Sequence, residues 1–472
     1  MTASISNISD SVSDPALDKI NDTFSKLQNT FSSGVTRAKS WRVQQLNQLS
    51  KLVDEHEKDI EKALLADLGK CQTEAFLSEI GYIQSEIKHT LKRLSKWMKP
   101  KKVSTPMLAM PGKSYLHPEP LGTVLIIGAW NYPFQLVIAP LVAAISAGNC
   151  AILKPSELSV NTSSLIAKLI PQYLDNDAFA VVEGAKDETT RLLSLPFDHS
   201  FYTGGEVVGK IVMRAAAEHL TPVTLELGGK SPCFVDSDTN LDVTANRIVW
   251  GKWMNAGQTC VAPDYILVVK GYEQALIGAI KKQLTKQYGA DVKDSEDYGR
   301  IVNQRHYARL MSYLDGQPIV HGGNSDESSR FIEPTLVLNP DLDSQIMQEE
   351  IFGPLLPIVS VDSIDAAIKF INERPKPLAL YVFSNNKTTQ TEVVEQTSAG
   401  SVCVNDGMMF MVNAELPFGG VGHSGMGSYH GKWGFDTFSH TKSVMKRSFW
   451  FDLDVRYAPF NKSKLKLLKL LQ

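Results

Sequence analysis

The stretch that decides the fold is LGTVLIIGAWNYPFQLVIAPLVAAISAGNCAILKPSE, residues 121–157. It contains two short apolar runs, Val124–Ile127 and Cys150–Leu153, separated by a segment of helical periodicity at Gln135–Ala147. Strands that are apolar throughout and alternate with helices are typical of a parallel sheet covered on both faces. We therefore expect an α/β domain of the doubly wound type, a design that binds nucleotides.

The same alternation extends along most of the chain. Further strands are expected at Ala180–Val182 and Phe201–Tyr202, and a second strand–helix series runs from about residue 231 to Ser401–Asn405. This pattern predicts two α/β domains with a boundary near Glu226–Gly229. Upstream of both, apolar residues recur at helical spacing from residue 17 to residue 98. The intervening residues 99–120 contain five prolines and predict an extended arm.

Length and composition exclude several classes of protein. The chain has 472 residues, enough for two or three domains, and its hydrophobic fraction of 43% is too high for a disordered protein. The net charge is 48 − 51 = −3, which argues against nucleic acid as a partner. The N-terminus lacks the pattern of a signal or transit peptide, and no stretch reaches the ~20 apolar residues of a membrane span. We expect a cytoplasmic protein with a disordered N-terminus, residues 1–16.

The cysteines do not form a metal site or a disulfide framework. There are five, widely spaced and without a CxxC pair. The acidic run 236–240 is not a calcium loop either, because Leu241 and Arg247 stand where that loop needs Gly and Glu. We therefore predict no metal. Cys260 follows the polar run Gly257-Gln258-Thr259, whereas the other four cysteines lie in or beside apolar segments and are expected to pack as small hydrophobes.

Two glycine motifs compete for a phosphate-binding role. Gly420–Gly425 matches GxGxxG but does not lie between a strand and a helix, so we expect a turn or a mobile loop there. Phe201–Lys210 does end a strand and open a helix, so its glycines could bring backbone N–H groups to a pyrophosphate. Such a turn is also common as a plain strand-to-helix corner.

Two further polar residues are candidates for chemistry. Asn131 directly follows the first strand, where its amide could stabilise an oxyanion or simply cap a helix before Pro133. Glu226 lies between Leu225 and Leu227, and partial burial there would raise its pKa towards the working range of a general base.

Taken in order, WNYP, KPSE, YTGG, LELGGKSP, NAGQTC, EEIFGP and LPFGGVG resemble the NAD(P)-dependent aldehyde dehydrogenase superfamily. The resemblance runs from about residue 20 to about residue 447, and residues 257–268 and 416–440 are similar to the class 3 branch. That branch acts on medium- or long-chain aliphatic and aromatic aldehydes, which it oxidises to carboxylic acids. An acylating dehydrogenase and a cysteine-dependent esterase or acyltransferase are the alternatives.

The resemblance also implies a domain plan. It predicts a Rossmann-like cofactor domain (17–98 and 121–226), an α/β catalytic domain (227–425) and an oligomerisation element made of the arm (99–120) and a bridging segment (426–450). A homodimer or homotetramer is the expected assembly.

By the same resemblance, Cys260 is the nucleophile, the Asn131 amide holds the oxyanion, and Glu226 activates the water that hydrolyses the thioester. Glu350 is a second candidate for the base, with a solvated charge as its alternative. NAD is the expected cofactor and NADP the alternative. The implied cofactor contacts are Lys154 and Glu157 at the adenosine ribose, Thr203, Gly204, Gly205 and Gly209 at the pyrophosphate, and Glu350 and Phe352 at the nicotinamide ribose. The substrate wall is expected to include Tyr132, Met254 and Phe418, with core packing as the alternative for Met254.

The C-terminal segment departs from a soluble class 3 enzyme. Residues 455–472 contain five cations and no acid. On a helix, Lys462, Lys466 and Lys469 would share one face and the leucines the other, with Lys464 intruding. Such a basic amphipathic tail (451–472) is too short to span a bilayer but could lie on an anionic membrane surface. The alternative is an exposed or subunit-packing tail.

Overall fold

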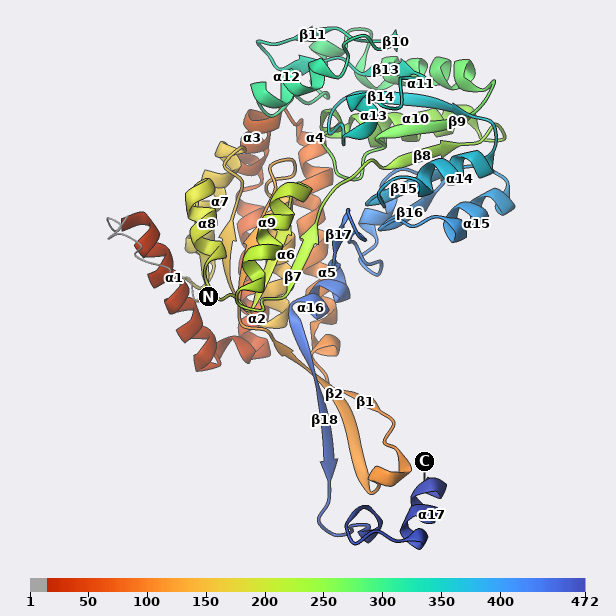
Figure 1. Ribbon diagram of the computed structural model, residues 1–472. Helices are drawn as coiled ribbons and strands as arrows, with labels where there is room; N and C mark the ends of the chain where they lie inside the picture. Colours follow the sequence, from red (N-terminus) through yellow and green to blue (C-terminus); the bar gives the residue numbers. More distant parts are fainter. Residues whose placement is uncertain (1–14, 472) are drawn as a thin grey trace, which may run out of the picture.

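Two α/β bodies and a projecting arm make up the computed structural model, which describes residues 15–471 (Figure 1). The first helix, α1 (Pro15–Ser33), begins two residues earlier than the sequence predicts. The disorder expected for residues 1–16 otherwise falls outside the described part of the chain. None of the helices within residues 15–471 has both the length and the apolar character needed to cross a membrane.

The first body contains a six-stranded sheet in the order β17-β7-β6-β3-β4-β5. Five of these strands are parallel, and β17 runs antiparallel to β7. Every residue of β3, β4 and β6 is buried, as the unbroken apolar runs predict for a sheet covered on both faces. The strands are β3 (Thr123–Ile127), β4 (Cys150–Lys154), β5 (Phe179–Val181), β6 (His199–Thr203), β7 (Val223–Glu226) and β17 (Gly425–Met426).

Helices cover this sheet from two parts of the sequence. The crossover helices are α6 (Gln135–Ala147), α7 (Val160–Tyr173), α8 (Lys186–Leu193) and α9 (Glu206–Ala217). The N-terminal helices also belong to this body, namely α2 (Lys39–Glu55), α3 (Glu57–Leu68), α4 (Gln72–Ala75), the π-helical turn η2 (Phe76–Ile80) and α5 (Gly81–Trp97). All thirteen residues of α6 are buried, which explains why its sequence is apolar on every side.

The second body contains a seven-stranded sheet in the order β10-β13-β14-β9-β8-β15-β16. It is parallel except for the edge strand β10. Its strands are β8 (Pro232–Val235), β9 (Tyr265–Val269), β10 (Ile319–His321), β13 (Thr335–Leu338), β14 (Leu355–Val361), β15 (Ala379–Phe383) and β16 (Ser401–Val404), and β11 (Ser325–Asp326) pairs separately with β12 (Phe331–Ile332). Its helices are α10 (Leu241–Trp253), α11 (Glu273–Tyr288), α12 (Gln304–Ser312), α13 (Gln345–Gln348), α14 (Ile364–Asn372) and α15 (Lys387–Gln396).

The arm joins two distant parts of the sequence in one sheet. Strand β2 (Gly112–Pro120) pairs on one side with β1 (Lys101–Val103) and on the other with β18 (Ser439–Arg447). The β2–β18 ladder is antiparallel over all nine residues of each strand. Helix α16 (Gly431–Thr437) precedes β18, and α17 (Lys462–Leu471) lies at the far end of the arm (Figure 1).

Candidate active site

Cys260 lies at the end of a sharply turned loop. Helix α10 ends at Trp253, and in the short η4 segment that follows, Asn255, Ala256 and Gly257 have left-handed φ angles of 54°, 51° and 76°. Glycine is required at position 257 for a second reason, because a Cβ there would lie 2.2 Å from the carbonyl oxygen of Gly353. Three consecutive left-handed residues are a strained arrangement, and strain of this kind clusters at functional sites.

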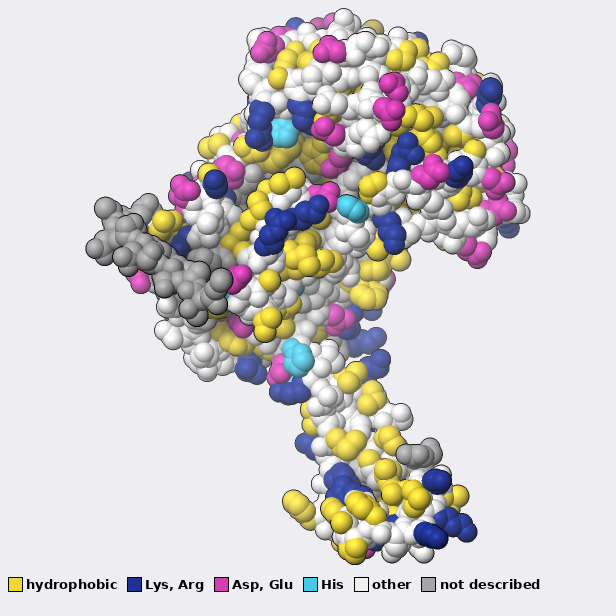
Figure 2. Space-filling model, in the orientation of Figure 1, with side chains coloured by type: hydrophobic (Ala, Val, Ile, Leu, Met, Phe, Trp, Pro, Cys, Tyr) yellow, Lys and Arg dark blue, Asp and Glu magenta, His cyan; other side chains and the backbone are white. Residues whose placement is uncertain are grey.

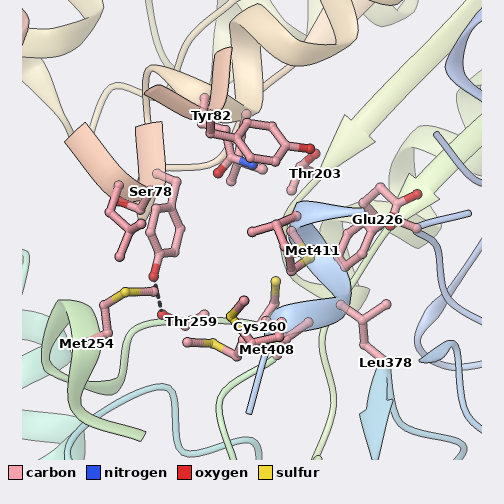
Figure 3. A pocket seen from close by; sticks show the side chains of 18 of the residues that line it. Ser78, Tyr82, Thr203, Glu226, Met254, Thr259, Cys260, Leu378, Met408 and Met411 are labelled. Atoms are coloured by element: carbon pink, nitrogen blue, oxygen red, sulfur yellow. Dashed lines mark hydrogen bonds between the residues drawn. The ribbon is translucent and has the colours of Figure 1, made fainter. Parts of the chain in front are cut away.

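The loop presents Cys260 to a cavity of about 150 Å³ (Figure 3). Residues of both α/β bodies line it, and its walls are almost entirely apolar. The three residues expected at the substrate wall, Tyr132, Met254 and Phe418, all line this cavity. Further methionines, including Met408 and Met411, line it as well. Methionine side chains are flexible and polarisable, so this wall can adapt to apolar ligands of different shape.

Glu226 reaches the same cavity from the carboxyl end of β7. Its side chain is buried, and neither carboxyl oxygen accepts a hydrogen bond from residues 15–471. Burial therefore raises the pKa of Glu226 well above its usual range, in the direction that the sequence predicts. A proton acceptor with an elevated pKa beside a thiol is suited to general-base chemistry.

The GxGxxG match is a structural turn that fixes Glu226. Gly425 pairs with Glu226 across the β17–β7 ladder, and the N–H of Leu227 donates to the carbonyl oxygen of Ser424. A Cβ on Gly425 would lie 2.0 Å from the carbonyl oxygen of Leu225. Glycine is needed there because two backbones approach closely, which explains the motif without a phosphate.

Two carboxyl groups, Glu350 and Glu226, affect the ionisation of Cys260. Burial, and next the charges of Glu350 and Glu226, raise the pKa of the Cys260 thiol to about 12. Burial, and next the charge of Asp264, raise the pKa of Glu350 to about 8. Its carboxylate packs against Gly228, where a Cβ would lie 2.2 Å from Oε1. Glu350 is half-buried, so it is not the fully solvated charge that was the alternative. Because the pKa of the thiol is raised, a base is needed to ionise Cys260 at neutral pH.

The Asn131 amide is directed at the Cys260 loop. Its Nδ2 donates a 3.0 Å hydrogen bond to the carbonyl oxygen of Gln258, and Nδ2 of Asn255 donates to the carbonyl oxygen of Asn131 at 2.8 Å. Asn131 is buried and therefore held in one orientation. One of its two amide hydrogens remains for a ligand near Cys260.

The residues expected to hold the cofactor lie around the carboxyl ends of β4 and β6. Lys154 ends β4, and its buried Nζ lies 3.5 Å from Glu157 Oε2. Gly205 is the N-cap of α9, and no atom lies within 4 Å of a Cβ built on it, so a phosphate can approach its backbone. These observations fit a dinucleotide.

The four other cofactor candidates have different surroundings. Gly209 faces Leu227, whose Cδ2 would lie 2.8 Å from a Cβ, so this glycine allows α9 to pack on β7. Gly204 packs against the hydroxyl of Tyr202. Thr203 lines the cavity that holds Cys260 (Figure 3). Phe352 has a left-handed φ of 48° and packs edge-on against Trp130.

The expectation for the other four cysteines is wrong in part. Cys150 and Cys233 are buried, and the half-buried Cys403 packs against the hydrophobic core, whereas the half-buried Cys71 lies outside that core. The sulfur of Cys71 caps α4 by accepting a hydrogen bond from the N–H of Glu74. An apolar segment beside a cysteine does not require its burial, and Cys71 lies at a helix end.

Sequence reasoning missed several residues that build the site. Ser78 and Tyr82 reach the cavity from the N-terminal helices, where the helical pattern gives no sign of them (Figure 3). Lys230 and Asp264 form an ion pair that holds the segment with Glu350, because Lys230 donates to the carbonyl oxygen of Glu349 and Asp264 accepts from the N–H of Ile351. The position of Lys230 within LELGGKSP was the one available signal.

The sequence matches the model of the aldehyde dehydrogenase family over residues 10–444. The chain belongs to the aldehyde dehydrogenase family. It is 50% identical to an aldehyde dehydrogenase of Canis lupus familiaris named dimeric and NADP-preferring, over 94% of this chain and 98% of that one. It is 51% identical to aldehyde dehydrogenase family 3 member A2 of Macaca fascicularis, over 93% of this chain and 91% of that one.

Solved structures of aldehyde dehydrogenases have the same fold. The substrate-bound state of Staphylococcus aureus AldH superimposes with a TM-score of 0.94 at 50% identity, covering 96% of this chain and 99% of that one. An indole-3-acetaldehyde dehydrogenase in complex with NAD⁺ gives a TM-score of 0.85 at 25% identity, covering 92% and 89%. The predicted fold and NAD(P)-dependent oxidation of aldehydes are thereby confirmed.

Proposed function

We propose that this aldehyde dehydrogenase oxidises apolar aldehydes of medium to long chain, or aromatic ones, through a covalent intermediate on Cys260. The observation that carries the proposal is the cavity itself. Cys260 and Glu226 are the reactive groups on a wall built mainly of methionine, leucine, valine and aromatic side chains, with Ser78, Gln135, Thr203 and Thr259 as its other polar residues. Burial of a saturated chain or a ring in such a site is favourable, by about 0.8 kcal/mol per methylene group.

The first chemical step forms a carbon–sulfur bond. Sγ of Cys260 adds to the carbonyl carbon of the aldehyde, and Glu350 accepts the thiol proton. The aldehyde oxygen becomes an oxyanion, which the Asn131 amide stabilises by a hydrogen bond. The cofactor supplies the hydride acceptor, and Lys154, Glu157, Gly205, Glu350 and Phe352 are the residues that would hold it.

The second step releases the acid. Once the adduct has been oxidised to a thioester, Glu226 takes a proton from water and the resulting hydroxide attacks the acyl carbon. The carbon–sulfur bond breaks, and the Cys260 thiolate is regenerated with a carboxylic acid as product. The two unpartnered oxygens of Glu226 support this role, because they have a free acceptor site for a water hydrogen.

Replacing Glu226 with Gln tests the assignment. The variant keeps the shape of the side chain but cannot accept the proton, so rapid mixing with aldehyde and NAD(P)⁺ should give about one reduced nicotinamide per active site and then a stall. Cys260→Ala is the control, and it should give no burst while still binding the cofactor. Full steady-state turnover by Glu226→Gln would contradict the role of Glu226, and faster turnover with added coenzyme A would favour an acylating enzyme.

A second experiment tests the substrate class. We expect kcat/KM to rise with chain length along a series of linear aldehydes, because each added methylene group displaces water from an apolar wall. Measuring the series with NAD⁺ and with NADP⁺ also determines which cofactor is preferred. A decline in kcat/KM from acetaldehyde upward would rule out the proposed class.

We also propose that the chain forms a homo-oligomer through its arm and that its C-terminal tail contacts membranes from the cytoplasm. Strand β18 is the edge of a three-stranded sheet, and an unpaired edge of nine residues is available to a second copy. Beyond β18, Phe449, Trp450 and Phe460 are 108%, 87% and 71% exposed. Hydrophobic and basic side chains lie together at the tip of the arm (Figure 2). Aromatic and basic side chains together are suited to the interface of an anionic bilayer.

A further inference from the structure

We propose that Lys70 and Glu79, a buried ion pair outside the cavity, are positioning residues that hold the Asn131 amide in place for the oxyanion. Neither side chain lines the cavity, and both are fully buried and bonded to each other. The inference rests on the oxyanion role proposed above for Asn131.

The ion pair contacts the WNYP loop along its length. Nζ of Lys70 donates a second hydrogen bond, of 3.3 Å, to the carbonyl oxygen of Asn131 and lies 4.1 Å from the centre of the Tyr132 ring. The free carboxyl oxygen of Glu79 accepts hydrogen bonds from the N–H groups of Phe134, at 2.9 Å, and Gln135, at 3.1 Å. The pair thus fixes both Asn131 and the start of helix α6.

Local backbone features bring these two charges under the loop. Gly69 ends α3 in a left-handed conformation with φ of 65°, which turns the chain so that Lys70 points inward. Glu79 lies in η2, a single π-helical turn, and such turns occur frequently at functional sites. A carboxylate at the first N–H groups of α6 also complements the positive end of the helix.

Asn131 is held from two opposite sides. Lys70 and Asn255 both donate to its carbonyl oxygen, the former from the N-terminal helices and the latter from the Cys260 loop. Its Nδ2 donates to the carbonyl oxygen of Gln258, two residues before Cys260. A shift of the Asn131 carbonyl would therefore move the amide relative to the sulfur, and reacting groups tolerate misplacement poorly.

A stability role alone does not account for this pair. Replacing both members of a buried ion pair with neutral groups is often tolerated, whereas removing one leaves an unpaired buried charge. The double variant Lys70→Met/Glu79→Gln avoids that unpaired charge, and the amide oxygen of Gln can still accept a hydrogen bond from α6. The variant removes the charged hydrogen bond to the Asn131 carbonyl.

The test is a mutant cycle that combines the double variant with Asn131→Ala. The quantity measured is the rate of the first hydride transfer at saturating aldehyde and NAD(P)⁺. In the wild-type background, the double variant should lower this rate about tenfold or more, with cofactor affinity unchanged. In the Asn131→Ala background, the same two substitutions should change the rate by less than about twofold, because the group they position is absent. Lys70→Arg, which keeps the buried ion pair but alters the hydrogen bond to the Asn131 carbonyl oxygen, serves as a second variant should the double variant not fold.

Asp67→Asn is the matched control. Asp67, near the end of α3, is another buried carboxylate that contacts the start of a helix. It accepts hydrogen bonds from the N–H groups of Asn161 and Thr162 at the beginning of α7. The Asp67→Asn variant should have a lower melting temperature, but its rate of first hydride transfer should stay within about twofold of the wild-type rate. An equal loss of rate in both backgrounds would overturn the inference. A normal rate for Asn131→Ala alone would instead overturn the oxyanion role on which it rests.

Discussion

At the scale of single residues, burial decides the chemistry of the site. The thiol pKa of Cys260 is raised to about 12, so almost no thiolate exists at neutral pH without a partner that takes the proton. Glu350, with a pKa raised to about 8, ionises closer to neutrality than the thiol does. Burial also raises the pKa of Glu226 well above its usual range, and its two oxygens have no partner among residues 15–471. The two carboxyl groups differ in their surroundings, because only Glu350 has nearby cations, Lys230 and Arg309, that lower its pKa against the effect of burial.

This difference predicts the pH dependence of the first turnover. A carboxyl group with a raised pKa is protonated below that pKa, so Glu350 accepts the Cys260 proton only as the pH rises through about 8. The burst rate of hydride transfer should rise over the same range. In Glu350→Gln, the rise should move towards the pKa of the thiol itself, leaving a low and flat burst rate between about pH 6 and 9. An unchanged profile in the variant would assign the thiol proton to Glu226.

At the scale of elements, left-handed residues place the reactive groups. The turn from Asn255 to Gly257 redirects the chain from α10 to Cys260, and its close contact with Gly353 fixes the Cys260 loop against the segment that carries Glu350. Similarly, Gly425 lets β17 pair with the end of β7 at Glu226. Glycine serves here for close backbone approach as well as for its φ angle.

Gly257→Ala should therefore cost more than backbone strain alone. A left-handed alanine costs about 1–2 kcal/mol, and the Cβ placed 2.2 Å from the Gly353 oxygen must also displace that segment. We expect the free energy of unfolding to fall by about 2–4 kcal/mol and the burst rate to fall with it. Gly271→Ala is the matched control, since Gly271 has φ of 90° and no atom within 4 Å of the added Cβ. Denaturant unfolding of both variants measures the loss in the free energy of unfolding. Equal losses would show that the contact between position 257 and Gly353 is unimportant.

Local patterns predicted the elements much better than the contacts between them. Apolar runs located β3 and β4, and family motifs located Cys260, Glu226 and Asn131, because both signals lie within short stretches of sequence. Lys70 and Glu79 could not be found in this way. They belong to an N-terminal helical region rich in charges, and only the fold brings them to Asn131, 61 residues further along the chain from Lys70.

At the scale of the whole molecule, the arm places the C-terminal tail far from both α/β bodies (Figure 1). The structure reduces the charge that the tail can present. Lys464 is bonded to Asp454, and Arg456 to Asp452, so these two cations are neutralised by acids that precede residue 455. Lys464, which the sequence predicts on the leucine face, anchors α17 to the preceding segment. Lys462, Lys466 and Lys469 form no ion pair with residues 15–471.

Three free lysines set the strength of the proposed membrane contact. Each is worth about 1 kcal/mol near an anionic leaflet, and the exposed leucines and aromatic side chains of the tip add apolar burial. Leu465, Leu467 and Leu470 are 53%, 41% and 82% exposed, so the leucine face is available. The attachment should accordingly be reversible and salt-sensitive.

Removal of residues 461–472 should abolish sedimentation with anionic vesicles and leave kcat for a short soluble aldehyde nearly unchanged. It should selectively lower activity on long-chain aldehydes presented in those vesicles, because such substrates partition into the bilayer.

A triple variant of the tail should weaken vesicle binding in the same way: Lys462→Gln/Lys466→Gln/Lys469→Gln. The matched control removes three exposed lysines of α2 and α3 and should leave vesicle binding intact: Lys51→Gln/Lys58→Gln/Lys62→Gln. If the truncated enzyme instead dissociates or unfolds, as sedimentation velocity and circular dichroism would show, the tail packs on a subunit and the membrane proposal is wrong.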